Sequence, residues 1–214
     1  MDEEITIIDS NTRNEKMKKF IINNKKKFII GFSILLITTV GYLSFEKIKK
    51  RNKIILGNKF NSAIINFDKE KKETTINELK TIVNKNDITY SPLALYFLLD
   101  NNLIENTNEV NKLFDKLINK THLEKEIKNL VIYKKALFNA DFINENDLIK
   151  ILNPIINSES IWKSHALYLI AEYFYSKDQK QKAKEFFNQI LLLVDVNQDI
   201  KLKSQKRISR ELGE

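Results

Sequence analysis

One segment of 18 residues without a charged side chain, from Phe28 to Phe45, constrains this chain more than any other feature. As an α-helix it is about 27 Å long, close to the roughly 30 Å hydrocarbon core of a bilayer. Eleven of its residues are Phe, Ile, Leu or Val, which together favour membrane insertion by about 3 to 7 kcal/mol. The segment therefore predicts a single transmembrane helix.

Three other interpretations of this segment are weaker. A buried core helix of this length usually carries one polar stripe, and no face of this segment carries a charge. A cleaved signal peptide needs a small-x-small site after its apolar core, but the first Ala after the segment is Ala63. A lipoprotein anchor needs a cysteine, and the chain has none. We therefore expect a permanent, uncleaved anchor.

The net charge of +8 first suggests a nucleic-acid partner, but its distribution along the chain argues against one. Residues 1–27 hold seven Lys or Arg and five Asp or Glu, residues 46–59 hold six and one, and residues 60–214 hold 23 and 22. Most of the excess therefore lies beside the apolar segment, where a membrane surface explains it. We predict no binding of nucleic acid.

The order of these segments predicts three parts: a tail of residues 1–27, the span of residues 28–45, and a helical domain of residues 46–214. Lysines flank the span on both sides in nearly equal number, so the flanking charge alone does not distinguish the two orientations of the span. Long domains translocate largely regardless of their charge, whereas short segments obey the positive-inside rule. This favours a cytoplasmic N-terminal tail.

Beyond the span, apolar residues recur three and four positions apart, as in amphipathic helices. The whole chain has only four Gly and two Pro, which leaves little turn chemistry for a many-stranded sheet. Ser91 before Pro92 predicts a helix start with Ser as the N-cap, and Pro154 predicts an interruption. We expect an all-α protein in which the transmembrane helix precedes a solenoid of antiparallel helix pairs.

The clearest pattern lies between residues 158 and 194, where two helical segments flank a turn at residues 176–178. A tetratricopeptide repeat places small residues where its two helices cross and aromatic residues beside them. Residues 200–212 predict a terminal helix that covers this pair, as solenoids require. Six residues occupy the packing positions of the repeat: Leu167, Ile170, Ala171, Phe174, Ala183 and Phe187.

If these six residues pack, the other side of the first helix is the candidate partner-binding groove. Tyrosine suits such a surface, because its ring offers a large rigid area with a polar tip. Two alternatives stay open, namely that this side is simply solvated or that it lies under a neighbouring helix. Trp162 is better explained as a packing residue. The candidate groove residues are His165, Tyr168, Glu172 and Tyr175.

The tail and span, EEITIIDSNTRNEKMKKFIINNKKKFIIGF, and the repeat, IWKSHALYLIAEYFYSKDQKQKAKEFFNQIL, carry a resemblance. The chain resembles the tetratricopeptide-repeat-like family of the ancillary subunit of the bacterial Sec translocon, also called the YfgM-like family. The resemblance implies a single-pass inner-membrane protein with a cytoplasmic N-terminus and a periplasmic C-terminal domain, near the translocon and periplasmic chaperones. It implies no catalytic chemistry. Residues 84–154 depart from regular repeat spacing.

The first functional hypothesis is thus a membrane-anchored interaction module that links secreted chains, translocon subunits and periplasmic chaperones. The alternative is a general cell-envelope scaffold, in division or outer-membrane assembly, without translocon contact. An enzyme is a remote third possibility, because neither His122 nor His165 has a metal-type partner at helical spacing, and no Gly-rich phosphate loop exists. We expect no cofactor, no metal and no small-molecule substrate.

Overall fold

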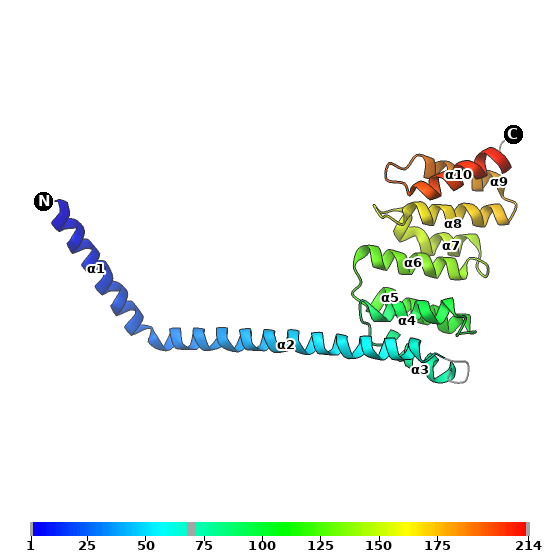
Figure 1. The fold of residues 1–214 in the computed structure, drawn as a ribbon. Helices are drawn as coiled ribbons and strands as arrows, with labels where there is room; N and C mark the ends of the chain where they lie inside the picture. Colours follow the sequence, from blue (N-terminus) through cyan, green and yellow to red (C-terminus); the bar gives the residue numbers. More distant parts are fainter. Residues whose placement is uncertain (1, 68–71, 213–214) are drawn as a thin grey trace. The chain divides into compact units, whose positions relative to one another are not determined.

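The computed structural model describes residues 2–67 and 72–212, and every regular element in these residues is an α-helix (Figure 1). No β-strand occurs in this part of the chain, so the all-α expectation is confirmed. The helices are α1 (Asp2–Asn23), α2 (Lys25–Ile65), α3 (Lys72–Val83), α4 (Tyr90–Asp100), α5 (Thr107–Lys120), α6 (Lys125–Asn139), α7 (Glu145–Ile156), α8 (Lys163–Ser176), α9 (Lys180–Leu191) and α10 (Gln198–Glu211).

The chain divides into two compact units between Ile55 and Leu56, inside helix α2. The first unit contains α1 and the predicted span. In α2 the large apolar side chains of residues 28–45 are all exposed, from Leu36 at 49% to Ile37 at 71%. This helix is long and apolar enough to cross a membrane, and its apolar window has no residue buried inside the structure. A membrane-spanning helix has this character, because lipid rather than protein covers its side chains.

The second unit begins with the last turns of α2, which pack into one of its two hydrophobic clusters. Ala63 is buried there together with residues of α3, α4 and α5. The ring of Phe60 lies 5.9 Å from that of Tyr90, and Phe67 meets Phe97 edge-on at 5.6 Å. The apolar residues Phe60, Ala63, Ile64 and Phe67, three and four positions apart, therefore pack into this cluster.

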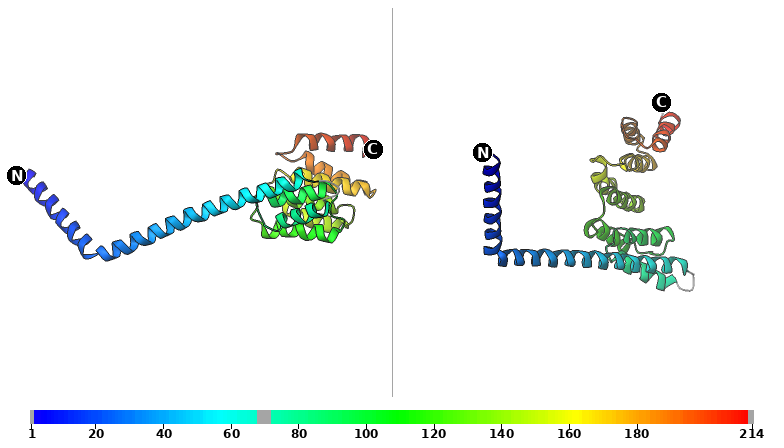
Figure 2. Two further views of the ribbon diagram at one scale, coloured as in Figure 1. Left: turned by 60° about the horizontal axis from the view of Figure 1, so that its bottom comes forward. Right: turned by 60° about the vertical axis from the view of Figure 1, so that its left-hand side comes forward.

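In the second unit, helices contact chiefly the helices next to them in the chain. The pairs α3–α4, α5–α6, α6–α7, α7–α8, α8–α9 and α9–α10 all pack together, and α8 also touches α6 and α10. In the right-hand view of Figure 2, the helices coloured from green to red are stacked in chain order. Short connections between helices of this kind favour such a stack of neighbours.

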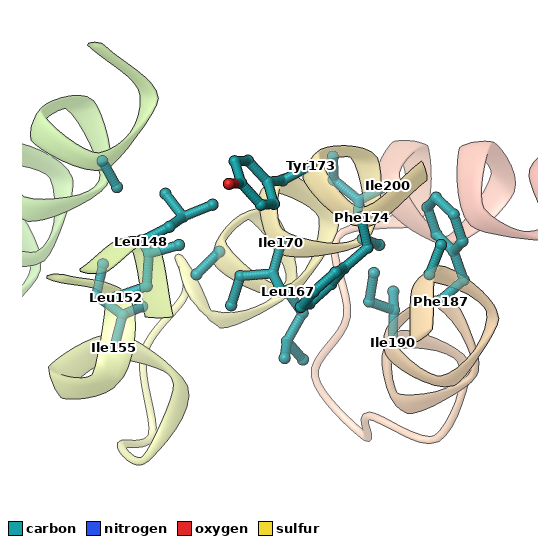
Figure 3. Packing of buried hydrophobic residues seen from close by; sticks show 14 of the residues in the cluster. Leu148, Leu152, Ile155, Leu167, Ile170, Tyr173, Phe174, Phe187, Ile190 and Ile200 are labelled. Atoms are coloured by element: carbon teal, nitrogen blue, oxygen red, sulfur yellow. The ribbon is translucent and has the colours of Figure 1, made fainter. Parts of the chain in front are cut away.

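The α8–α9 hairpin lies at the centre of the other hydrophobic cluster (Figure 3). All six predicted packing residues are buried, with Ala171, Ala183 and Phe187 at 0% exposure. Figure 3 shows Leu167, Ile170 and Phe174 of α8 between the apolar residues of α7 and those of α9. The predicted turn is present: α8 ends at Ser176, and Asp178 adopts a left-handed conformation with φ of 57°.

Two of the local predictions were wrong. Helix α4 begins at Tyr90, one residue before Ser91, because the Asp87 carboxylate accepts hydrogen bonds from the backbone N–H groups of Thr89 and Tyr90. The Ser91 hydroxyl is buried and donates to the Ile82 carbonyl at 2.8 Å. Pro154 lies inside α7, which continues to Ile156. Pro154 has no N–H to donate to the carbonyl four residues before it, so α7 lacks one hydrogen bond there, and only two of its residues follow the proline.

Asparagine side chains cap three of the helices. Asn106 accepts hydrogen bonds from the N–H groups of the first turn of α5, and Asn144 and Asn197 do the same for α7 and α10. Each cap satisfies backbone donors that otherwise have no partner, which stabilises a helix by about 1 kcal/mol. The high Asn content of the chain therefore contributes directly to where its helices begin.

Candidate functional site

The four candidate groove residues all lie on α8, and each is half-buried. Their spacing of three and four residues places them along one side of the helix. Tyr133 of α6 and Trp162, the N-cap residue of α8, border the same side. We call this surface the α8 face; it consists of Tyr133, Trp162, His165, Tyr168, Glu172 and Tyr175.

At one end of the α8 face, helix α10 contributes an arginine. Arg207 donates from Nε to Glu172 Oε1 at 2.8 Å and from Nη2 to Oε2 at 2.9 Å, a bidentate pair. The same guanidinium lies 4.7 Å above the centre of the Tyr175 ring. Planar guanidinium groups suit both contacts. Glu172 and Tyr175 therefore lie under a neighbouring helix, one of the two alternatives left open by the sequence.

Tyr168 lies between α9 and this ion pair. Its ring meets the buried Phe187 edge-on at a centroid distance of 5.6 Å. Burial raises the pKa of Tyr168 to about 12, and the Glu172 carboxylate adds to the increase while Arg207 opposes it. The phenol consequently keeps its proton at physiological pH, and it can act as a hydrogen-bond donor but not as a base.

At the other end of the face, three rings pack together. The Tyr133 ring stacks on Trp162 with centroids 5.9 Å apart, and His165 lies 5.2 Å from Trp162 and 6.0 Å from Tyr133. Burial lowers the pKa of His165, an effect that the Asp199 carboxylate and the Ile161 backbone oppose and that Lys203 reinforces. The cluster is a preformed aromatic surface with a largely neutral imidazole at its centre.

A polar network holds this ring cluster in place. Ser160 donates to the Glu126 carboxylate of α6 at 2.7 Å, and it accepts hydrogen bonds from Asn129 at 3.0 Å and from the backbone N–H of Trp162 at 3.2 Å. These bonds attach the start of α8 to α6. They fix Trp162 beside Tyr133, so the aromatic surface depends on two helices that are some 30 residues apart in sequence.

The sequence identified four of the residues on this surface, and it missed those contributed by other helices. Tyr133, Asp199, Lys203 and Arg207 belong to α6 and α10, and no residue spacing links them to α8.

A related contact joins α4 and α6, where the Lys134 ammonium lies 4.5 Å above the Tyr96 ring. Burial raises the pKa of that tyrosine well above its ordinary value. The only sequence signal for such residues was the presence of Tyr and Lys on amphipathic helices.

A separate hollow of about 310 Å³ lies where α7 ends, α8 begins and α9 ends. Its lining contains one cation, Lys163, and neither an acid nor a histidine, so it brings together no acid–base pair. Among residues 13–67, 72–210 and 212, whose side chains the structure describes, no three His, Cys, Asp or Glu side chains form a group that could hold a metal ion. The lining residues are Ile156, Asn157, Lys163, Leu167, Phe186, Gln189, Leu192 and Leu193.

The geometry of the α8 face suits contact with another macromolecule better than catalysis. It presents half-buried aromatic rings held by a defined network, and its one carboxylate, Glu172, is already paired with Arg207 of α10. Aromatic side chains in such settings are the usual anchors of protein interfaces.

Comparisons of the chain with protein-family models, with curated proteins and with solved structures find no match.

Proposed function

We propose that this chain is a single-pass membrane protein whose helical domain binds extended segments of other proteins through the α8 face. The observation that carries the proposal is the ring cluster of Tyr133, Trp162 and His165, which is half-exposed and held rigid by the hydrogen bonds of Ser160. Rigid rings lose little conformational entropy when a partner binds. The apolar helix α2 supports the membrane attachment.

In the more specific form of this proposal, the domain is a tetratricopeptide-repeat-like solenoid of the YfgM-like kind. The packing of each helix against its neighbours and the buried positions of Ala171 and Ala183 support a repeat organisation. The protein then lies in a bacterial inner membrane with its N-terminus in the cytoplasm and its domain in the periplasm. There it assists the Sec translocon and connects secreted chains with periplasmic chaperones.

Photocrosslinking from the edge of the α8 face tests this function. Lys203 is half-exposed and close enough to Tyr133 and His165 to affect the pKa of both. We expect a photoreactive residue at this position to crosslink to translocon subunits, chaperones or secreted chains in intact membranes. The same residue in place of the exposed Lys150 of α7 is the matched control.

Each outcome of this experiment decides between the hypotheses. Crosslinks to division or outer-membrane assembly proteins alone contradict the translocon role and favour the general scaffold. Equal labelling from both positions contradicts the α8 face as a binding surface.

A His165→Ala variant separates binding from catalysis, since the interaction module predicts weaker partner capture without loss of any enzymatic activity.

A topology reporter fused after Glu214 tests the compartment. We expect activity from a reporter that works only in the periplasm, because long domains after a short cytoplasmic tail are translocated. Activity of a cytoplasm-only reporter at the same position would overturn the periplasmic assignment, and with it the roles in secretion.

A further inference from the structure

We propose that residues 47–53 of α2 bind the headgroups of anionic phospholipids in the leaflet next to the end of the span. The inference depends on the membrane span of the proposed function and does not involve the α8 face. Five of these seven residues are cationic, and all five are exposed. The segment, which we call the basic collar, carries Lys47, Lys49, Lys50, Arg51 and Lys53.

The charges of the basic collar are not neutralised by the rest of the chain. Residues 46–59 contain a single acid, Glu46, against six cations. None of the five collar cations belongs to a salt bridge in the described part of the chain. By contrast, Lys80, Lys135 and Arg207 of the helical domain each pair with a carboxylate. The collar cations therefore have no carboxylate partner in the described part of the chain, and anionic lipid headgroups can take that place.

Helix α2 continues without a break through the collar, and this determines how its cations are arranged. At 100° per residue, the five cations occupy about 200° of the helix circumference. The remaining sector contains Phe45, Ile48, Asn52 and Ile55, and the three apolar side chains among them are exposed at 68%, 59% and 44%. Cations spread over this much of the circumference can contact several headgroups around the helix where it leaves the bilayer.

The depth of the collar also matches the headgroup layer. With a rise of 1.5 Å per residue, Lys47 lies about 3 Å beyond Phe45, Lys50 about 8 Å and Lys53 about 12 Å. The headgroup region of one leaflet is about 5 to 8 Å thick. Lys47 and Lys50 therefore bracket this layer, and the flexible Lys53 side chain can reach back to it.

Lipid phosphate is favoured over nucleic acid because the cations adjoin the span and encircle much of a single helix. A nucleic-acid surface needs cations spread over a face that matches a groove or backbone track. The helical domain offers no such face, because residues 60–214 hold 23 cations and 22 acids. Each cation near an anionic membrane surface contributes attraction that is lost when the surface is neutral.

Fluorescence quenching by brominated lipids tests the proposal with the full-length chain in vesicles. A Phe45→Trp substitution puts an indole beside the collar, and the parent chain, which retains only Trp162, is subtracted. The vesicles contain phosphatidylcholine and phosphatidylglycerol, and either lipid is brominated in turn. We expect a binding constant for phosphatidylglycerol relative to phosphatidylcholine of about five or more, corresponding to at least one cation near the surface.

Charge variants in the Phe45→Trp background provide the decisive comparison. Replacing the five collar cations with Gln should reduce the relative binding constant to about one. The control removes five exposed lysines of the helical domain that form no salt bridge with the residues that the structure describes, and it should leave the constant unchanged. The control substitutions are Lys85→Gln, Lys112→Gln, Lys120→Gln, Lys150→Gln and Lys206→Gln.

Three results would overturn the inference. Equal quenching by both brominated lipids would contradict the preference for phosphatidylglycerol. It would still support the membrane span, because quenching by either lipid places the indole in the bilayer. Loss of the preference in inorganic phosphate, but not in chloride of the same ionic strength, would indicate a site for free anions instead. Absence of quenching by either lipid contradicts the span itself, and the proposed membrane attachment fails with it.

Discussion

Residues 28–45 of α2 and helix α8 are both rich in large apolar side chains, but the two segments distribute them differently. In residues 28–45 the apolar side chains occupy every side of the helix, and all of them are exposed in the structure. In α8 they occupy the sides that face α7 and α9, while tyrosines, a histidine and a glutamate occupy another. Phe32 is 62% exposed, whereas Phe187, which packs against α8, is fully buried.

This difference in the distribution of apolar side chains shows which surroundings each helix requires. A helix that is apolar all round has no side to present to water, so lipid is its natural surroundings. A helix that is apolar on part of its surface can bury that part against other helices and keep its polar groups in water. Matched substitutions in the two regions, ordered from the largest expected effect to the smallest, test this comparison.

The largest effect is expected from truncating the same residue type in the two regions. Phe187→Ala should lower the free energy of unfolding of the helical domain by about 3 to 5 kcal/mol, because it leaves a cavity in the core. Phe32→Ala should leave that free energy unchanged. Urea unfolding of the full chain in detergent, followed by the fluorescence of Trp162, measures both. A similar loss in both variants would contradict the separation of the two regions.

A charge at the centre of the span should have the next largest effect. Ile37→Lys should make membrane insertion less favourable by about 3 to 4 kcal/mol, a large part of the total apolar contribution. Resistance of the protein to alkaline extraction from membranes measures the loss. Leu192→Lys is the control, since Leu192 is 83% exposed in the helical domain and should tolerate a charge. Normal retention of Ile37→Lys would show that residues 28–45 do not cross the bilayer.

Glycine substitutions in two parts of the same helix should differ in their effect on the stability of the domain. A Cβ added at Gly57 would lie 2.5 Å from the Tyr90 hydroxyl oxygen and 2.7 Å from a ring carbon, whereas at Gly41 nothing lies within 4 Å. Gly57→Ala should therefore destabilise the domain by about 1 to 3 kcal/mol through overpacking. Gly41→Ala should not affect it. Thermal unfolding of both variants is the measurement, and a more stable Gly57→Ala variant would exclude the close Gly57–Tyr90 packing.

The smallest expected effect is a pH dependence that only the helical domain can show, because residues 28–45 contain no charged side chain. Burial lowers the pKa of His165 in the folded state, whereas the unfolded value is about 6.5. Between these two pKa values the unfolded chain binds more protons, so the free energy of unfolding decreases as the pH falls through that window.

Urea unfolding between about pH 5 and pH 8 measures this dependence. His165→Gln should flatten the decrease at low pH, and His122→Gln, at an exposed site, should retain it. An unchanged profile in His165→Gln would mean that burial in the ring cluster does not control the protonation of this histidine.

The sequence predicted several elements correctly because their signals are local. Helix periodicity and the shortage of Gly and Pro indicated an all-α chain, and small residues at 171 and 183 indicated a close helix crossing. The two wrong predictions were also local. Ser91 resembled an N-cap, but Asp87 performs that role, and the Ser91 hydroxyl instead bonds to Ile82. Several residues near a helix start can cap it, and their tertiary partners select among them.

By itself, the sequence predicted a helical domain after the span and showed that residues 28–45 suit a membrane, since both depend on the order of apolar and polar residues along one helix. It did not predict helix α1 in the tail. Only the tertiary structure decided the composition of the α8 face. Tyr133 and Arg207 reach that face from helices 30 or more residues away, and Arg207 covers part of the predicted groove. Periodicity describes the sides of a single helix, whereas the packing of separate helices decides which side meets a neighbour.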